Sequence, residues 1–433
     1  MGFLNWHQAY AGGLKQNIGQ EKLYNIQAKL QQEYSNLPFL NLKHLSELIP
    51  ALQGISSQLT RFKNMLILGI GGSALGPKAL QQSFYPTQNL PEYKGKRLYV
   101  LDNIYPGRLE QHLTHLAPED TVVVVISKSG TTLETISQYF LVKKWLQKNR
   151  QQFQKHLVIV TDPQKGFLRQ EVKKNGYLSL TIPPKLGGRY SILSAVGLLP
   201  ASFLGLNYLK LIEGAKSLST IDDLLNHPAL KLACWAFDLI ACGKNELIFF
   251  NYIPYWECWG EWFAQLWAES LGKNQTGSMP IPAIGVRDQH SLLQMFMDGP
   301  QNKGCLFLNV EKLPQAEMLD MDLPEEWKFL ENKSIGDIFL AESIGTLMSL
   351  GQKMPLVELT VEQANEYELG KLILLLELTT LLTGWLLDIN PLNQPGVEKG
   401  KRLAKAKLGA PGFVQEQKEL EHFQQQKKNS QGF

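Results

Sequence analysis

A lysine, a glycine and four hydroxyl side chains follow one another in the loop SKSGTT, residues 127–132. The β-branched run at 122–126 predicts a buried parallel strand before this loop, and a helical pattern begins near Glu134. Free backbone N–H groups and the helix dipole at such a junction favour an anion, and the hydroxyls add neutral donors. The loop is therefore a candidate anion cradle, with a capped helix start as the alternative interpretation.

The loop GIGGSALGP, residues 69–77, is a second candidate for binding a phosphate. It follows an apolar strand pattern, and its glycines let the backbone approach a ligand closely. A dinucleotide-binding fold is the competing interpretation, because Gly69, Gly71 and Ala74 fit G-x-G-x-x-A and Asp102 ends the next strand pattern. Two cradles on neighbouring strands fit one compact phosphorylated ligand better.

Arg189 and Glu269 carry the charges that a proton transfer through an oxyanion needs. Arg189 lies in GGRYS, at a strand-to-helix turn, and could stabilise the oxyanion; a surface arginine is the alternative. Glu269 shares one helix face with Gln265, four residues earlier, on a helix rich in tryptophan. Because burial raises the pKa of a carboxyl toward that of a useful general base, Glu269 is a candidate base. The alternative is a structural glutamate.

His290, in DQHS, and Lys401, in QPGVEKGK, are two further ionisable candidates. His290 starts a helical pattern that runs to residue 297, and Lys401 lies on a short helix after a Pro-Gly turn. A lone histidine is more often structural than catalytic, and the second segment by itself is typical of a solvated charged turn. Because no second histidine stands at metal-ligand spacing, the sequence predicts no metal site.

Strand and helix patterns alternate regularly along the chain and must position these residues. The strand patterns lie at 65–68, 97–101, 122–126, 156–161 and 178–182, and then at 247–252, 305–310 and 354–359. Such alternation predicts α/β units with doubly wound parallel sheets. We expect an N-terminal helical segment at 1–45, a first α/β domain at 46–205, and a second at 206–433 that ends in C-terminal helices.

Composition narrows the classes of function. The chain has 433 residues with 43 Lys and Arg against 40 Asp and Glu, and this balance argues against a broad nucleic-acid-binding surface. Four cysteines without paired metal spacing favour a reduced, cytoplasmic setting. The N-terminus MGFLNWHQAY has no basic start and no apolar h-region, so we expect no signal peptide. The apolar stretch 372–387, interrupted by Glu377, predicts a buried core helix rather than a membrane span.

Together, six motifs resemble the phosphoglucose isomerase family in its short bacterial form. They stand in the family's order between about residues 66 and 401: LGIGGSALGP, ISKSGTTLET, GGRYSILSAVGLLP, QLWAESLGK, GVRDQHSLLQ and NQPGVEKGK. The resemblance implies an α/β fold of two sugar-isomerase (SIS)-type three-layer α/β/α domains with parallel sheets. It also implies reversible isomerisation of D-glucose 6-phosphate to D-fructose 6-phosphate, a step of glycolysis and gluconeogenesis, without metal or cofactor, in a cytoplasmic homodimer.

The resemblance also implies a role for each candidate residue. Glu269 corresponds to the base that moves a proton between C1 and C2 through a cis-enediolate, which Arg189 stabilises. His290, which the family takes from the partner subunit, and Lys401 correspond to residues that open the sugar ring. The counterparts of the substrate-binding residues, with Lys128 acting chiefly through its backbone, are Gly72, Ser73, Ser127, Lys128, Ser129, Thr132 and Gln265.

Two departures from the family's pattern leave the substrate preference open. Ala74 stands where many members have an acidic residue, and Gly130 stands where longer members have a bulkier one. Activity on mannose 6-phosphate is a close variant that the motifs do not exclude. The more distant alternatives are a nicotinamide-dependent dehydrogenase built on the first glycine loop and a non-enzymatic sugar-phosphate sensor. The presence of Glu269 and His290 disfavours the sensor.

Overall fold

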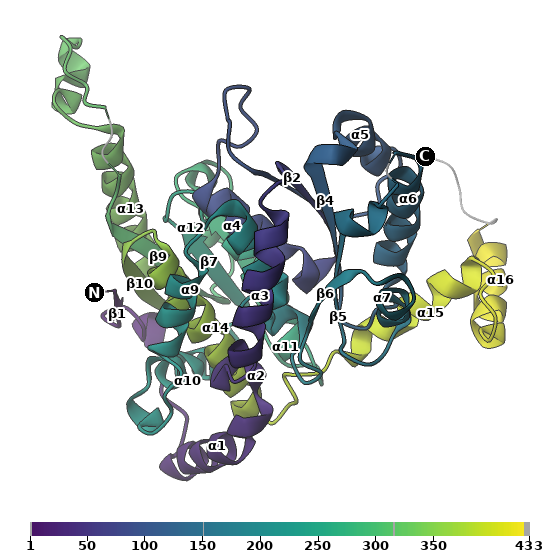
Figure 1. The fold of residues 1–433 in the computed structure, drawn as a ribbon. Helices are drawn as coiled ribbons and strands as arrows, with labels where there is room; N and C mark the ends of the chain where they lie inside the picture. Colours follow the sequence, from purple (N-terminus) through teal and green to yellow (C-terminus); the bar gives the residue numbers. More distant parts are fainter. Residues whose placement is uncertain (1, 150, 315–316, 428–433) are drawn as a thin grey trace.

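The computed structural model describes residues 2–149, 151–314 and 317–427, and contains two five-stranded sheets with helices on both faces (Figure 1). The first sheet has the order β3-β2-β4-β5-β6, and all its strands are parallel. Each of its strands lies where the hydrophobic pattern predicts one. They are β2 (Asn64–Leu68), β3 (Arg97–Leu101), β4 (Thr121–Ser127), β5 (Leu157–Thr161) and β6 (Leu178–Thr181).

The second sheet has the order β1-β10-β9-β7-β8 and is parallel except at one edge. Its strands are β1 (Phe3–Asn5), β7 (Glu246–Asn251), β8 (Met279–Ile284), β9 (Lys303–Lys312) and β10 (Leu356–Gln363). The edge strand β1 pairs antiparallel with β10, with Phe3 opposite Thr360. The expectation of a helical N-terminal segment is therefore wrong for residues 3–5. Strand β8 was also not among the strands predicted from the sequence.

Alternating side chains along the strands fill three apolar cores, so each sheet lies between two helical layers. The outer face of the first sheet is covered by α5 (Arg108–His115), α6 (Leu133–Asn149) and α7 (Phe167–Asn175). The outer face of the second is covered by α12 (Leu293–Asp298) and α13 (Ile335–Gly351). The core between the sheets includes α1 (Gln20–Glu33), α2 (Pro38–Asn41), α3 (Leu45–Leu59), α4 (Leu75–Phe84), α8 (Ala195–Leu204), α9 (Tyr208–Lys216), α10 (Pro228–Ala241), α11 (Cys258–Leu271) and α14 (Glu366–Leu386).

Helix α14 is the apolar helix predicted from the sequence. It is long and apolar enough to cross a membrane, but 94% of its most apolar window is buried inside the protein. Its backbone packs directly on α9, because a Cβ added to Gly370 would come 2.0 Å from the carbonyl oxygen of Leu211. The helix is therefore part of the core, as predicted.

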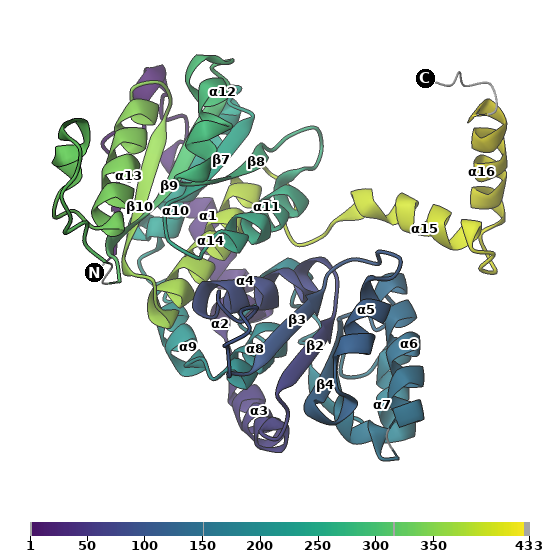
Figure 2. The same ribbon diagram turned by 90° about the horizontal axis from the view of Figure 1, so that it is seen from above.

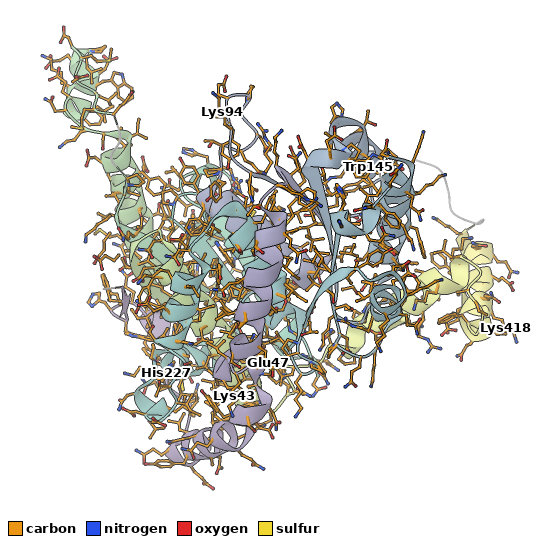
Figure 3. All side chains as sticks on the ribbon, in the orientation of Figure 1. Lys43, Glu47, Lys94, Trp145, His227 and Lys418 are labelled. Carbon is orange, nitrogen blue, oxygen red and sulfur yellow. The ribbon has the colours of Figure 1, made fainter. Side chains whose placement is uncertain are left out.

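The last two helices, α15 (Glu398–Lys407) and α16 (Val414–Lys427), form an arm that we call the C-terminal arm, residues 398–427. Figure 2 shows this arm lying apart from both sheets and their covering helices. The side chains of α16, among them the labelled Lys418, also stand clear of the body in Figure 3. C-terminal helices were predicted at the end of the chain, and the structure has them at Glu398–Lys407 and Val414–Lys427, while residues 428–433 lie outside the described residues.

Candidate active site

The site lies at the carboxyl edge of the first sheet, where ligands bind in open α/β sheets. Strands β2 and β4 are neighbours in register, with Leu68 opposite Val125. The loop GIGGSALGP follows β2 and the loop SKSGTT follows β4, so the two predicted cradles open side by side. The GGRYS loop follows β6 in the same sheet. The topology thus brings three of the motifs to one edge.

The SKSGTT loop forms a cluster of hydroxyls at the start of α6. Ser127 is buried, and its Oγ lies 2.8 Å from Oγ1 of Thr132 and 3.5 Å from Oγ of Ser129. Gly130 has φ +64° and lies tightly in the turn, because a Cβ there would come 3.1 Å from Oγ1 of Thr161. The short hydroxyls and the unpaired N–H groups at a helix start together fit an anion.

Lys128 adds a positive charge beside this hydroxyl cluster and is repelled by Arg189 of the GGRYS loop. Its side chain is half-buried, and its backbone carbonyl accepts the N–H of Asp162 at 3.2 Å. Burial lowers the pKa of the Lys128 ammonium; the Asp162 carboxylate opposes this effect, and repulsion from Arg189 adds to it. The positive charge of Arg189 therefore adds to that of Lys128 beside the hydroxyl cluster, which favours an anionic ligand there.

The two glycine-rich loops touch through their backbones. A Cβ added to Gly72 would come 2.3 Å from both the carbonyl carbon and oxygen of Gly188, so no larger residue fits without a shift. Gly71, with φ +57°, lies against α11, since a Cβ there would come 2.8 Å from Nε2 of Gln265. Ser73 ends the same short turn, η3 (Gly71–Ser73). This loop therefore links the GGRYS turn to the helix that carries Glu269.

Glu269 lies between a guanidinium and an amide. Nη1 of Arg189 donates to Oε2 of Glu269 at 3.1 Å, and Nε2 of Gln265 donates to Oε1 at 2.9 Å. The Arg189 side chain is 1% exposed, whereas that of Glu269 is 30% exposed. The carboxylate is therefore held in one orientation by a buried charge and keeps an edge open to a ligand. A base needs this geometry for a directed proton transfer.

Sequence reasoning gave no role to several residues that hold Arg189. Its Nε donates to Oγ of the buried Ser270 at 2.7 Å, and Nη1 also donates to Oε1 of Gln394 at 2.9 Å. Nη2 donates to the carbonyl oxygens of Pro391 at 2.6 Å and Asn393 at 3.1 Å. Ser270 and Gln394 both lie in motifs already recognised in the sequence. Membership of those motifs is the sequence feature that could have identified them as site residues.

The two residues assigned to ring opening lie elsewhere in the single chain. His290 ends the short turn η8 (Arg287–His290), after β8 of the second sheet, and its side chain is exposed. Lys401 is exposed on the C-terminal arm, where its Nζ lies 2.8 Å from Oε1 of Glu398. Among the interactions of residues 2–149, 151–314 and 317–427, none joins either side chain to Arg189 or Glu269. In the described part of a single chain, neither residue is therefore joined to Arg189 or Glu269 by a hydrogen bond or an ion pair.

Asp102, the residue on which the dinucleotide alternative depends, is occupied by ion pairs. Its carboxylate oxygens lie 3.2 Å from Nη1 of Arg108 and 3.6 Å from Nζ of Lys78. A carboxylate that binds a ribose hydroxyl needs free acceptor positions toward the ligand. The geometry favours the phosphosugar interpretation over the dinucleotide one.

Comparisons with known proteins also support the phosphosugar interpretation. A family model described as phosphoglucose isomerase matches residues 39–323 and 331–424. A glucose-6-phosphate isomerase from Carboxydothermus hydrogenoformans is 35% identical over 406 residues, which cover 89% of this chain and 87% of that protein. One from Rubrobacter xylanophilus is 37% identical over 360 residues, covering 80% and 82% of the two chains.

Solved structures agree with the fold. A hypothetical protein from Thermus thermophilus aligns with a TM-score of 0.81 at 29% identity, covering 94% of this chain and 100% of that one. A glucose-6-phosphate isomerase from Chlamydia trachomatis gives 0.73 at 22% identity, covering 88% and 76%. A tagatose-6-phosphate ketose/aldose isomerase from Escherichia coli gives 0.52 at 12% identity, covering 88% and 98%. The architecture is that of the SIS-type α/β proteins, as predicted.

Proposed function

This chain belongs to the phosphoglucose isomerase family, and from that premise we propose how its site works. It is an aldose–ketose isomerase that converts glucose 6-phosphate to fructose 6-phosphate and back. The proposed mechanism is ring opening followed by proton transfer through a cis-enediolate, with Glu269 as the base. The observation that carries this proposal is the Glu269 carboxylate held between Arg189 and Gln265, beside two anion-binding loops.

The phosphate end of the substrate binds in the SKSGTT loop. The hydroxyls of Ser127, Ser129 and Thr132 and the backbone of Lys128 supply neutral donors, and Lys128 adds positive potential. Gly72 and Ser73 line the sugar, and the absence of a side chain at Gly72 lets this loop pack directly on the backbone of Gly188, next to Arg189. Binding energy from the phosphate, which takes no part in the chemistry, orients the reacting carbons.

The proton transfer takes place at C1 and C2 of the open-chain sugar. Glu269 removes the C2 proton of the aldose, and the electron pair of that C–H bond forms the enediolate double bond while the carbonyl oxygen becomes an oxyanion. The protonated Glu269 returns the proton to C1 while the proton of the C2 hydroxyl passes to the O1 oxyanion, so that C2 becomes the carbonyl carbon of the ketose and C1 carries the hydroxyl. Arg189 is a fixed charge near this oxyanion, and it stabilises the intermediate without reorganising. No net redox change occurs, so the steps need no external oxidant or reductant.

Ring opening requires an acid and a base near the ring oxygen and the anomeric hydroxyl. We assign these roles to His290 of the partner subunit and to Lys401, in a cytoplasmic homodimer. The exposure of both side chains in a single chain supports this assignment, because each is free to meet a second subunit. Mannose 6-phosphate differs from glucose 6-phosphate only at C2, where Glu269 acts, so a second activity on it remains compatible with this site.

A coupled assay tests the function directly. Purified protein is given fructose 6-phosphate, and the glucose 6-phosphate formed is measured by a dehydrogenase that reduces a nicotinamide cofactor. We expect turnover that is the same with and without a metal chelator, after control reactions show that the coupling enzyme tolerates it. Absence of turnover contradicts the proposed function, and turnover that the chelator abolishes contradicts the metal-free mechanism.

A further inference from the structure

Lys273 lies directly behind the base, at the carboxyl end of α11. Its Nζ donates to the backbone carbonyl oxygen of Glu269 at 2.7 Å and to that of Ser270 at 2.6 Å. The last four carbonyls of a helix have no partner within the helix, and a cation there is stabilising. Lys273 therefore stabilises the helix turn that contains the proposed base, Glu269, and Ser270, whose hydroxyl accepts a hydrogen bond from Arg189.

A tight turn fixes Lys273 in this place. Lys273 and Thr276 form an isolated antiparallel bridge, and the two residues between them, Asn274 and Gln275, have φ of 50° and 60°. Two successive left-handed residues are the pattern of a type I′ turn. Gly277 follows with φ +104°, and a Cβ there would come 2.7 Å from the carbonyl oxygen of Leu271. The turn thus folds back onto the helix end and leaves the lysine little freedom.

Few charges surround the ammonium of Lys273. Among the residues that the structure describes, the charged groups that act on it are Arg189 of the short turn η6 (Gly188–Tyr190) and Glu269 of α11. Burial, followed by repulsion from Arg189, lowers the pKa of Lys273 to about 8, against the opposing effect of the Glu269 carboxylate. The lysine therefore loses its charge as the pH rises through the mildly alkaline range.

We propose that Lys273 is a positioning residue for the isomerisation: its ammonium holds the last turn of α11 so that Glu269 stays aligned with Arg189 and the reacting carbons. This inference rests on the proposed role of Glu269 as the base. It differs from an ordinary helix cap in one respect, which is that the charge on Lys273 is coupled to catalysis and not only to stability.

The test compares the pH dependence of kcat and KM in the parent protein and three variants. In the parent protein we expect kcat to fall as the pH rises through about 8, because Lys273 then loses its proton. Lys273→Arg keeps donors and charge at high pH, so this fall should move to higher pH. Lys273→Met should lower kcat about 10- to 100-fold with little change in KM, because misplacement of a catalytic group acts on the transition state. The fall of kcat near pH 8 should be absent from this variant, because methionine carries no proton to lose.

Lys303→Met is the matched control. Lys303 is buried and donates to the carbonyl oxygen of Pro300 at 2.7 Å, but it lies at the amino end of β9, away from the site. We expect this variant to unfold at lower temperature while the pH profile of kcat keeps its shape. If neither Lys273 variant changes the pH profile, Lys273 is only a helix cap. That result leaves the proposed function standing, which is tested separately by turnover of Glu269→Gln.

Discussion

At the scale of single residues, Arg189 is the most constrained group in the site. Its three nitrogens make five hydrogen bonds, to Ser270, Glu269, Gln394 and the carbonyls of Pro391 and Asn393. A guanidinium held in this way cannot swing toward a substrate. In the proposed mechanism the oxyanion forms beside this fixed charge, which would stabilise the transition state without the cost of reorganising donors.

Thr132→Val tests the anion cradle. The hydroxyl of Thr132 lies 2.8 Å from that of Ser127, and valine keeps the shape but removes the donor. Loss of one hydrogen bond to a charged phosphate costs about 1.5–3 kcal/mol, so we expect KM for fructose 6-phosphate to rise about tenfold or more, with part of the loss in kcat. Steady-state kinetics measure both constants.

The matched control for the cradle is Thr114→Val. Thr114 lies on α5, and its hydroxyl donates to the carbonyl oxygen of Glu110 at 2.9 Å within that helix. We expect unchanged kinetics from this variant. An unchanged KM in Thr132→Val, next to a correctly folded control, contradicts the assignment of the SKSGTT loop to the phosphate.

The sequence was sufficient to find the residues of the site that have charge and a regular spacing. Gln265 and Glu269 share a helix face by their four-residue separation, and Arg189 stands out in a turn with two glycines. The contact of Gln394 with Arg189 was not predicted, although Gln394 lies in a recognised motif, because it depends on packing between segments 205 residues apart. Lys273 was missed for a different reason, since its partners are nearby backbone carbonyls, which any sequence contains.

At the scale of elements, the site depends on loops that touch without side chains. The η3 turn packs its Gly72 against the backbone of Gly188, and Gly71 packs against Gln265 of α11. Loops of the first sheet and helix α11 of the second are thereby fixed relative to one another at the candidate site. Hydrogen bonds from Lys78 to Glu261 at 2.9 Å and from Gln82 to Glu257, the N-cap residue of α11, at 3.1 Å also join α4 to α11 and its amino end.

Gly72→Ala should break this contact. The new Cβ would stand 2.3 Å from backbone atoms of Gly188, so the two loops must separate. We expect a loss of stability of about 1–3 kcal/mol from overpacking, and a fall in kcat/KM of about 100-fold, because a displacement of about 1 Å misplaces the catalytic groups. Thermal unfolding and steady-state kinetics give the two quantities.

Gly188→Ala serves as the control for stability, because a Cβ there meets no atom within 4 Å. Its unfolding temperature should stay close to that of the parent protein. Equal unfolding temperatures and equal activity for Gly72→Ala and the parent would show that the loops do not depend on this close approach.

The strands of the first sheet were predictable because each is a short apolar run ended by glycine or polar residues. Strand β8 was not, since it contains Pro280 and Pro282, and proline donates no hydrogen bond to a sheet. The strand lies at the edge of the second sheet, where this defect is tolerated. Strand β1 has only three residues, and its place beside β10 is decided by tertiary packing rather than by local propensity.

At the scale of the whole molecule, the residues proposed for proton transfer contact one another within one chain, whereas the pair proposed for ring opening is exposed. Arg189, Gln265 and Glu269 meet between the two sheets, whereas His290 is exposed after β8 and Lys401 is exposed on the C-terminal arm. The alternation of elements was sufficient to predict two α/β units.

Subunit mixing tests whether sites are shared in a homodimer. Glu269→Gln and His290→Ala are each expected to be nearly inactive. If the site combines Glu269 of one subunit with His290 of the partner subunit, hybrids keep one intact site of two. Random reassociation of equal amounts should then restore about a quarter of the parent activity.

Each variant taken alone through the same dissociation and reassociation should gain nothing. No gain from the mixture, when hybrid dimers are shown to have formed, contradicts the sharing of the site. A monomeric protein with full activity contradicts the need for a second subunit altogether.

The measurement that tests the central claim most directly is the turnover of Glu269→Gln, made together with its affinity for fructose 6-phosphate. Glutamine keeps the shape and can still accept the hydrogen bond that Arg189 donates at 3.1 Å, but it cannot take a proton from carbon. We predict that kcat falls by about 10²- to 10⁴-fold while the dissociation constant, measured by calorimetry, changes only a few-fold. Turnover close to that of the parent protein, with binding intact, would contradict the assignment of Glu269 as the base.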